Sequence, residues 1–221
     1  MNRLRCAVLA VVMGAVVVGC GGSGQAPPGP ERATDDRERA ADRERADERP
    51  ERYRLAMPDR VVEKRYERDH DASPPDETLA EVLAGQVQDA QAAFGVYRPA
   101  GSGDYGGGMI TVTGVHGVVL SPVTARDELL DVLDRRDLVR QVVVAPRTIT
   151  PPGSEEPLLC RVVERGYEGD DHTSLNASCT WAEASTVATV VTSVQTPPGT
   201  GELDAFAAVA GAMRDDVRVG Y

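Results

Sequence analysis

Two periodicities of hydrophobic and polar residues run through the chain after about residue 52. In three segments the apolar residues recur at helical spacing, which predicts amphipathic helices. The first covers 73–90, with Ser73 or Asp76 as its cap; the second starts near Ser121; the third covers 202–214. Their expected core residues are Leu79, Val82, Leu83, Val87 and Ala90 in the first, Leu129, Leu130 and Leu133 in the second, and Leu203, Phe206, Ala207, Ala210 and Met213 in the third.

Other segments are rich in β-branched residues and are bounded by glycine, proline or acidic turns, which predicts strands. A short one at 53–57 is followed by Pro58, as suits an edge strand. The longer ones cover 92–97, 109–120, 140–149, 158–165, 176–182 and 186–194. Runs of consecutive strands mixed with helices are typical of the α+β class. We therefore predict one α+β domain over 52–221, with a mostly antiparallel sheet, about three covering helices and one disulfide.

The first 19 residues have a different pattern. Two arginines precede an apolar run, Cys6 to Gly19, of 14 residues. A membrane span needs about 20 apolar residues, so this run is too short. A basic start, a short apolar run and small residues at its end are typical of a secretory signal peptide, which we assign to 1–19.

Residues 20–51 separate this segment from the domain. They begin with a Gly/Pro-rich stretch and continue with alternating acidic residues and arginines, in which DRERA occurs at 36–40 and again at 42–46. Such a segment has almost no large apolar residue with which to offset the entropy of ordering. It is expected to be a disordered, charged tether. Some acid–arginine pairs fall at helical spacing, and whether the tether is transiently helical stays open.

The four cysteines differ in their surroundings. Cys6 lies in the segment that would be removed, and Cys20 follows Val17, Val18 and Gly19. The stretch VVGC resembles a bacterial lipobox, which implies that Cys20 receives a diacylglycerol and, after cleavage and further acylation (palmitate among the acyl groups), becomes the new N-terminus. Stable anchoring takes more than one acyl chain. The implied location is the outer face of the cytoplasmic membrane, with the membrane as a partner through this lipid anchor.

Cys160 and Cys179 remain, both in predicted strands. An even number of cysteines in an exported domain favours a disulfide between them. A metal pair with His172 is the alternative, but the spacing lacks the paired short loops of zinc sites.

The stretch CTWAEASTVATVV, residues 179–191, resembles a Cys-x-Trp-Ala-x-x-Ser-Thr-Val element of uncharacterised exported or membrane-tethered proteins from high-GC Gram-positive bacteria. In that element the residue after Trp-Ala is usually Asp, whereas here it is Glu183. The resemblance covers roughly 52–221, supports the domain and the disulfide, and implies no catalytic residue. Trp181 is expected to share a strand face with Cys179 and to pack on the disulfide; a Trp that stacks on a ligand is the alternative.

Candidate chemistry in the domain is sparse. The segment GSGDYG, 101–106, matches a nucleotide-binding glycine pattern, but a strand follows it where a phosphate-binding helix would be needed. His70 and His116 lie apart in the sequence, and Asp170, Asp171 and His172 form an acidic cluster that could hold a cation or act in acid–base catalysis. Adjacent acidic residues in a polar loop are more often simply solvated. Asn176 opens a formal glycosylation sequon, which we discount in a strand of a bacterial protein.

Charge and composition limit the classes of binding partner that the domain is expected to have. The formal net charge is −11, which disfavours nucleic acid and an electrostatic hold on anionic lipid headgroups. No catalytic residue, metal ligand or cofactor is predicted. We expect a non-catalytic binding or structural domain whose partner is an envelope protein or a small ligand. The alternatives are a carrier of apolar ligands, which needs a large cavity, and an exported hydrolase.

Overall fold

The structure, a computed structural model, describes residues 52–72, 77–102, 108–167 and 170–221. These residues belong to one compact unit, Arg49–Tyr221. The predicted signal peptide, Cys20 and the whole predicted tether lie outside them. No helix in these four ranges is long and apolar enough to cross a membrane.

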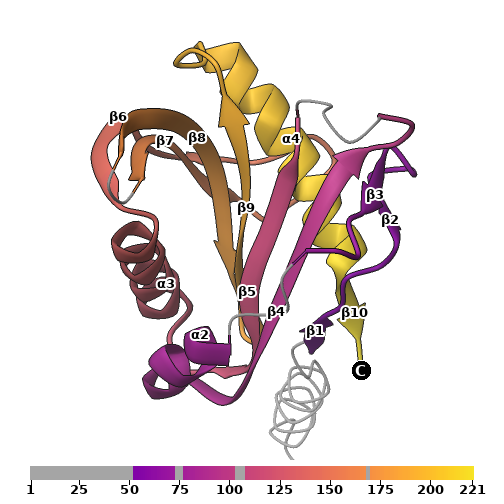
Figure 1. The fold of residues 1–221 in the computed structure, drawn as a ribbon. Coiled ribbons are helices and arrows are strands. Elements are labelled where there is room, and N and C mark those ends of the chain that lie inside the picture. Colours follow the sequence, from indigo (N-terminus) through magenta and orange to yellow (C-terminus); the bar gives the residue numbers. More distant parts are fainter. Residues whose placement is uncertain (1–51, 73–76, 103–107, 168–169) are drawn as a thin grey trace, which may run out of the picture. The chain divides into compact units, whose positions relative to one another are not determined.

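The main element is an antiparallel sheet with the strand order β2-β3-β4-β5-β9-β8-β7-β6 (Figure 1). Consecutive strands pair antiparallel along its whole width. The strands are β2 (Arg60–Val61), β3 (Tyr66–Arg68), β4 (Val87–Pro99), β5 (Ile110–Val119), β6 (Val139–Ile149), β7 (Leu158–Tyr167), β8 (Asp170–Ala182) and β9 (Thr186–Val194).

Three α-helices accompany the sheet in the described ranges. They are α2 (Glu77–Val82), which continues into a 3-10 turn at Leu83–Gly85, α3 (Pro122–Arg136) and α4 (Thr200–Val217). Two further strands, β1 (Tyr53–Leu55) and β10 (Arg218–Gly220), form a separate antiparallel pair. The α+β class and the largely antiparallel sheet are confirmed.

One face of the sheet packs under α4, and we call it the α4 face (Figure 1). Side chains of α4 that recur at helical spacing are fully buried against apolar side chains of β5, β7, β8 and β9. These strand residues sit at alternate positions, because successive side chains of a strand point to opposite faces. The members that carry this packing are Leu203, Ala207, Ala210 and Met213 from the helix, and Val112, Val162, Trp181 and Val190 from the strands.

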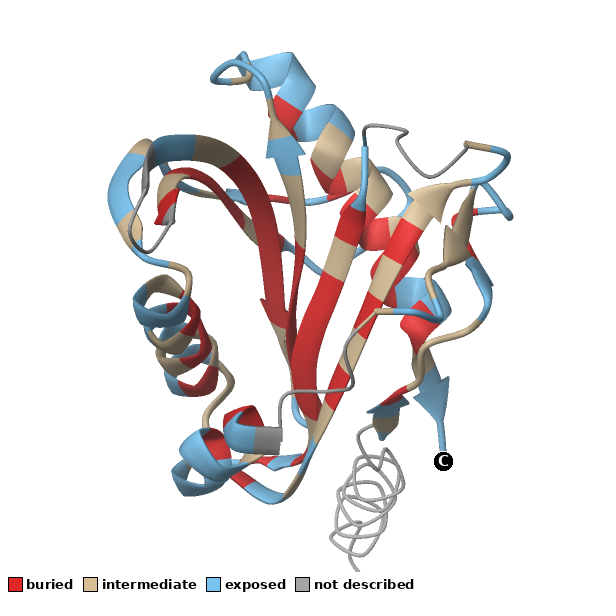
Figure 2. Ribbon diagram, viewed as in Figure 1, coloured by how far each residue is buried: buried red, intermediate tan, exposed pale blue. Residues whose placement is uncertain are grey.

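The opposite face, the α3 face, is covered over part of its area by α3 and the α2 segment. Leu129 and Leu133 of α3 and Leu83 of the 3-10 turn pack there on Val115 and Val187. Figure 2 shows that the central strands are buried along most of their length, whereas the edge strand β6 is largely exposed. The domain therefore has two cores, one on each side of the sheet.

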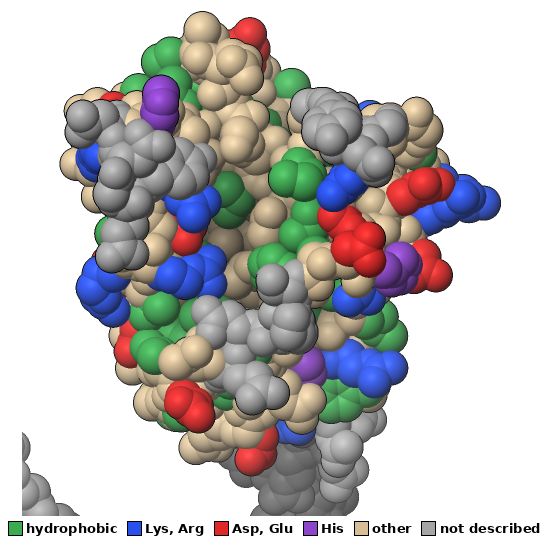
Figure 3. All heavy atoms as spheres, viewed as in Figure 1, with side chains coloured by type: hydrophobic (Ala, Val, Ile, Leu, Met, Phe, Trp, Pro, Cys, Tyr) green, Lys and Arg blue, Asp and Glu red, His purple; other side chains and the backbone are tan. Residues whose placement is uncertain are grey.

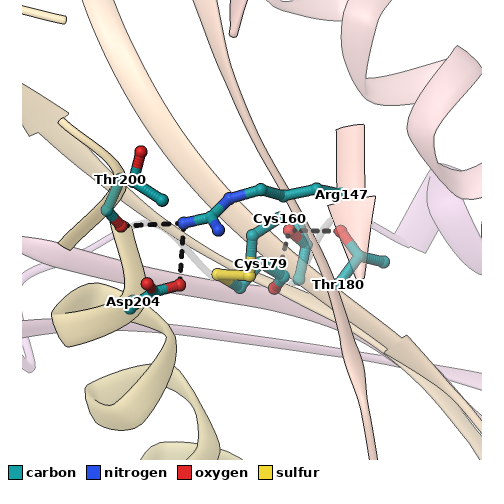
Figure 4. Close-up of a disulfide and its surroundings, with 7 residues drawn as sticks. Arg147, Cys160, Cys179, Thr180, Thr200 and Asp204 are labelled. Carbon is teal, nitrogen blue, oxygen red and sulfur yellow. Dashed lines mark hydrogen bonds and ion pairs between the residues drawn. A yellow bond between two sulfur atoms is a disulfide. The ribbon is translucent and has the colours of Figure 1, made fainter. Parts of the chain in front are cut away.

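The predicted disulfide between Cys160 and Cys179 is confirmed. The two cysteines are directly paired across β7 and β8 and are fully buried on the α4 face. Figure 4 shows Arg147 of β6 beside them, donating hydrogen bonds to the Thr200 carbonyl oxygen at 2.8 Å and to Asp204 at 2.7 Å. The covalent bond thus joins two strands beneath α4, and the arginine ties the edge strand to the start of that helix.

The prediction for the first helix is wrong over its second half. The helix does not run to Ala90: it ends at Val82, and Val87 already pairs with Val119 as the first residue of β4. Val82, expected in the core, is exposed. The periodicity misled because β4 carries a bulge between Gln88 and Gln91, with Asp89 in the left-handed region, which breaks the strand alternation.

We expect the disulfide to contribute about 3 kcal/mol to the free energy of unfolding, because it closes a loop of 19 residues. The test is denaturant unfolding of residues 49–221, which contain both cores, with and without the paired substitutions Cys160→Ala and Cys179→Ala. Equal midpoints for the two proteins would contradict the expectation.

Candidate ligand-binding site

Polar side chains are buried on the α3 face at the centre of the sheet. Asn176, Ser178 and Thr180 of β8 alternate with the apolar residues that β8 sends to the α4 face. Across the neighbouring strand pairs, Thr180 lies beside Thr189, which in turn lies beside Thr113. All five side chains are at most 6 % exposed. Buried hydroxyl and amide groups normally have hydrogen-bond partners, since burial without one costs free energy.

Some of these groups have such partners. The Thr180 hydroxyl donates to the Thr189 hydroxyl at 3.0 Å, and the Ser193 hydroxyl donates to Asn176 Oδ1 at 3.2 Å. By contrast, Ser178 Oγ and Thr113 Oγ1 are buried and have no hydrogen-bond partner among the described residues. The hydroxyl groups of Ser178 and Thr113 can therefore still form hydrogen bonds at the middle of this face.

A recess opens on the same face beside the C-terminal part of α3. We define it by the residues that line it. Figure 3 shows this side of the domain hollowed near its middle. The recess has a volume of about 30 Å³. That is room for one small polar group, or about two water molecules. The lining residues are Leu130, Leu133, Asp134, Asp137, Val139, Arg161, Val163, Arg165, Asn176, Ser178, Thr189 and Val191.

Charges in the recess are paired. Arg161, 8 % exposed, donates from both terminal nitrogens to the carboxylate of Asp134, with Nη1 at 2.8 Å from Oδ2. Arg165 lies 3.8 Å from Asp137. The bidentate geometry uses the outer edge of the Arg161 guanidinium, while its Nε is buried and has no partner in the part of the chain that the structure describes. The recess thus holds two arginines and two aspartates, and the Nε–H of Arg161 is an unused hydrogen-bond donor there.

The chain that borders the recess is strained. Leu138 follows α3 and has φ 50, a left-handed conformation that is uncommon for a residue with a large side chain. Its side chain is 44 % exposed, between Asp137 and Val139 of the lining. Strained backbone of this kind persists only where the surroundings hold it, and it gathers at functional sites.

The residues proposed for an acid–base cluster do not meet a second histidine. His172 is exposed near the start of β8, beyond the end of β9, whereas His116 pairs with Thr186 at the start of β9. The nine residues of β9 span roughly 30 Å. The side chains of Asp170 and Asp171 lie outside the described ones. His70 is exposed and lies 3.4 Å from Asp59.

His116 lines a different depression, together with Arg52, Arg54 and Asp89. Its Nδ1 is buried and has no partner within the four described ranges. Burial, with a smaller contribution from Arg54, lowers the pKa of this histidine. Both arginines are exposed, so this depression is open to solvent.

Trp181 is a core residue and not an exposed stacking platform. It is 3 % exposed and belongs to the same cluster as Cys179, as its position two residues along the strand predicts. Its indole N–H donates to the Thr186 hydroxyl at 3.0 Å, and that hydroxyl donates to Glu183 at 2.5 Å. Both of these hydrogen bonds lie within the β8–β9 connection.

Glu183, which the sequence marks only as a departure from Asp, helps to hold the C-terminal end of α4. It accepts a hydrogen bond at 2.7 Å from Arg218, which also lies 2.7 Å from Glu156 and 4.6 Å from the ring of Tyr53. Burial opposes the charge of Arg218, but the carboxylates of Glu183, Glu156 and Asp215 outweigh it and raise its pKa. The fully buried Arg214 donates to Ser154 and to the Glu156 carbonyl. The charged groups of this network pair with one another and join three segments of the chain, although Arg218 Nε has no hydrogen-bond partner among the described residues. We therefore interpret the network as mainly structural.

The glycine pattern of residues 101–106 joins β4 to β5, two antiparallel neighbours. Residues 103–106 lie outside the described ones. A strand follows the pattern, as predicted, so the arrangement lacks the helix N-terminus that would receive a phosphate.

Comparison of the chain with protein-family models, curated proteins and solved structures finds no match. The support for the candidate site is therefore its geometry alone. Sequence reasoning missed it, although the alternation of Asn176, Ser178 and Thr180 with apolar residues was a usable signal. The polar side of such a strand is ordinarily the solvent side, and only the fold places it beneath α3.

We expect Ser178→Ala to leave the free energy of unfolding unchanged or to raise it by up to about 1 kcal/mol, because the hydroxyl is buried without a partner. The matched control is Thr180→Val, two residues along the same strand face. It removes a hydroxyl that is hydrogen-bonded, and it should lower the free energy by about 1 kcal/mol. Denaturant unfolding of residues 49–221 measures both. A cost for Ser178→Ala as large as that for Thr180→Val would show that Ser178 has an internal partner.

Proposed function

We propose that this chain is a lipoprotein, held at the outer face of the cytoplasmic membrane by acyl chains on Cys20, whose folded domain binds a small ligand in the recess without catalysing a reaction. The observation that carries the binding function is the set of buried polar atoms without partners at the recess, Ser178 Oγ and Arg161 Nε, with Thr113 Oγ1 nearby on the same face. A bound ligand that hydrogen-bonds to these atoms would remove the cost of burying them.

The location is supported by the lipobox-like VVGC and by the disulfide, since disulfides form and persist outside the reducing cytoplasm. In this proposal the charged segment 20–51 is a spacer between the membrane and the domain. Taken as a flexible coil, it would span roughly 30 Å root-mean-square. The domain would then reach ligands near the membrane surface without touching the lipid.

A non-catalytic role is favoured by the chemistry at the recess. Its ionisable side chains are two arginine–aspartate pairs, and each aspartate already accepts a charged hydrogen bond or lies in an ion pair. Carboxylates held in this way are poor general bases, because the paired arginines already bind their oxygen atoms. The apolar-carrier alternative needs a large cavity between helices and sheet. On the α4 face core side chains fill most of that space, and an open depression of about 280 Å³ remains near the start of α4, lined by Val194, Leu203 and Phe206 among others.

The anchor is tested by mass spectrometry of the full chain extracted from the membranes of a bacterial host that lipidates exported proteins. The expected protein begins at Cys20 and carries the mass of a diacylglycerol and any further acyl chain. Cys20→Ala is the control, and it should leave an unmodified chain. A natural chain that still starts at Met1, or that starts beyond Cys20 without modification, would refute the anchor.

Binding is tested by native mass spectrometry of residues 49–221, secreted by a high-GC Gram-positive host and purified without detergent. We expect one small molecule per chain, and we expect Ser178→Val to reduce its occupancy about tenfold by removing the hydroxyl and filling part of the recess. Thr180→Val should retain the molecule. A natural chain without a bound molecule, or equal occupancy in Ser178→Val, would overturn the binding proposal.

A further inference from the structure

The charge balance of the recess narrows the class of ligand. Each terminal nitrogen of Arg161 gives one N–H to Asp134, so the guanidinium still has its Nε–H to offer, but its charge is already balanced by that carboxylate. An anionic group placed there would also meet the carboxylates of Asp134 and Asp137, and a cation would meet the two arginines. Burying an unpaired charge beside a satisfied ion pair costs more free energy than it returns. A neutral group avoids both penalties.

The two buried atoms without partners, Arg161 Nε and Ser178 Oγ, determine which hydrogen bonds that neutral group must form. Arg161 Nε can only donate a hydrogen bond, whereas the hydroxyl of Ser178 can donate and accept. Arg161 and Ser178 are direct cross-strand neighbours on β7 and β8, so their side chains share one side of the sheet. One hydroxyl group satisfies both, since it accepts from the guanidinium and exchanges a hydrogen bond with the serine. The volume of about 30 Å³ matches a group of this size.

Apolar side chains continue from the recess across the uncovered part of the same face. Val163 and Val191 line the recess, and Val142, which pairs with Val163 on the edge strand, is 49 % exposed. On the other side, Val191 pairs with Thr111, which pairs with the half-buried Val96. A ligand anchored in the recess by a hydroxyl can therefore lay an apolar part along this row and remove it from water.

We infer that the recess binds an uncharged amphiphile, which inserts a hydroxyl group between Ser178 and Arg161 and lies with its apolar part along the neighbouring valines. This inference rests on the proposed function of the same site and adds the chemical class of the ligand. The inference concerns the chemical class of the ligand and not the biological origin of the amphiphile.

The test uses residues 49–221 labelled with ¹⁵N and four probes that differ in one property each. Hexyl β-D-glucopyranoside is neutral and has both parts; hexanoate and hexylammonium carry the same chain with a charge; glucose lacks the chain. We expect saturable amide shifts at residues 133–139, 161–163 and 176–178 with the hexyl glucoside. We also expect it to bind at least about tenfold more tightly than each of the others.

Two substitutions make the readout specific to the recess. Ser178→Ala should weaken the binding of the hexyl glucoside about fivefold to tenfold, which is the contribution expected of one hydrogen bond. Asp134→Asn leaves the charge of Arg161 uncompensated, and it should raise the affinity for hexanoate about tenfold without strengthening the glucoside. The matched control is Asp204→Asn, whose ion pair with Arg147 lies on the surface elsewhere; it should change neither affinity.

The outcomes separate the inference from the proposed function. Tighter binding of hexanoate or hexylammonium than of the glucoside at these amides, with dependence on Ser178, would overturn the uncharged class and leave a small-ligand site in place. Equal binding of glucose and the hexyl glucoside would overturn the apolar part. If no probe shifts these amides, the inference is wrong, and the native mass measurement alone decides whether the site binds a ligand.

Discussion

The alternation of side chains along four long, directly paired strands organises this domain. In β5, β9, β8 and β7 every second residue points to α4 and the others point to α3. Because the pairing is in register at the centre of the sheet, rows of side chains of one type are built across it. A shift of one residue would exchange the two faces, so both cores and the recess depend on the same register.

The two faces differ in how they are stabilised. The α4 face is apolar and closely packed, and its disulfide lies between two neighbouring strands beneath the helix. The α3 face buries hydroxyl and amide groups, some of which satisfy one another and some of which have no partner. A face with unpartnered buried polar groups is less stable than an apolar one. A site that binds a polar ligand must keep such groups available, so the lower stability is a consequence of the proposed binding. The division assigns stability to one side of the sheet and the proposed binding to the other.

Paired charges have different roles at the two ends of the domain. At the C-terminal end of α4, Arg214 and Arg218 are surrounded by acceptors from three separate segments, and they lock the helix to the sheet. At the recess, Asp134 balances the charge of Arg161 but leaves its Nε–H unused. In the first network the arginines join several segments of the chain, and Arg218 Nε has no partner among the described residues. At the recess the charges of the arginines and aspartates balance beside the unpartnered hydroxyl of Ser178, and this is the basis for the uncharged ligand that we infer.

The amino-acid sequence by itself determined the fold class, the positions of α3 and α4, the central parts of the longer strands, and the pairing of Cys160 with Cys179, because these depend on periodicity and on the parity of the cysteines. It placed the starts of two strands wrongly: β4 begins at Val87 and not at 92, and β8 begins at Asp170 and not at 176, in a segment predicted to be a polar loop. It could not reveal that the first helix stops at Val82, since a bulge in β4 imitates helical spacing. Only the tertiary structure decided the site. Asn176, Ser178 and Thr180 are the polar side of an amphipathic strand, which in most sheets faces water. Here α3 and the neighbouring strands bury that side, and burial turns ordinary hydroxyl groups into hydrogen-bonding atoms without partners.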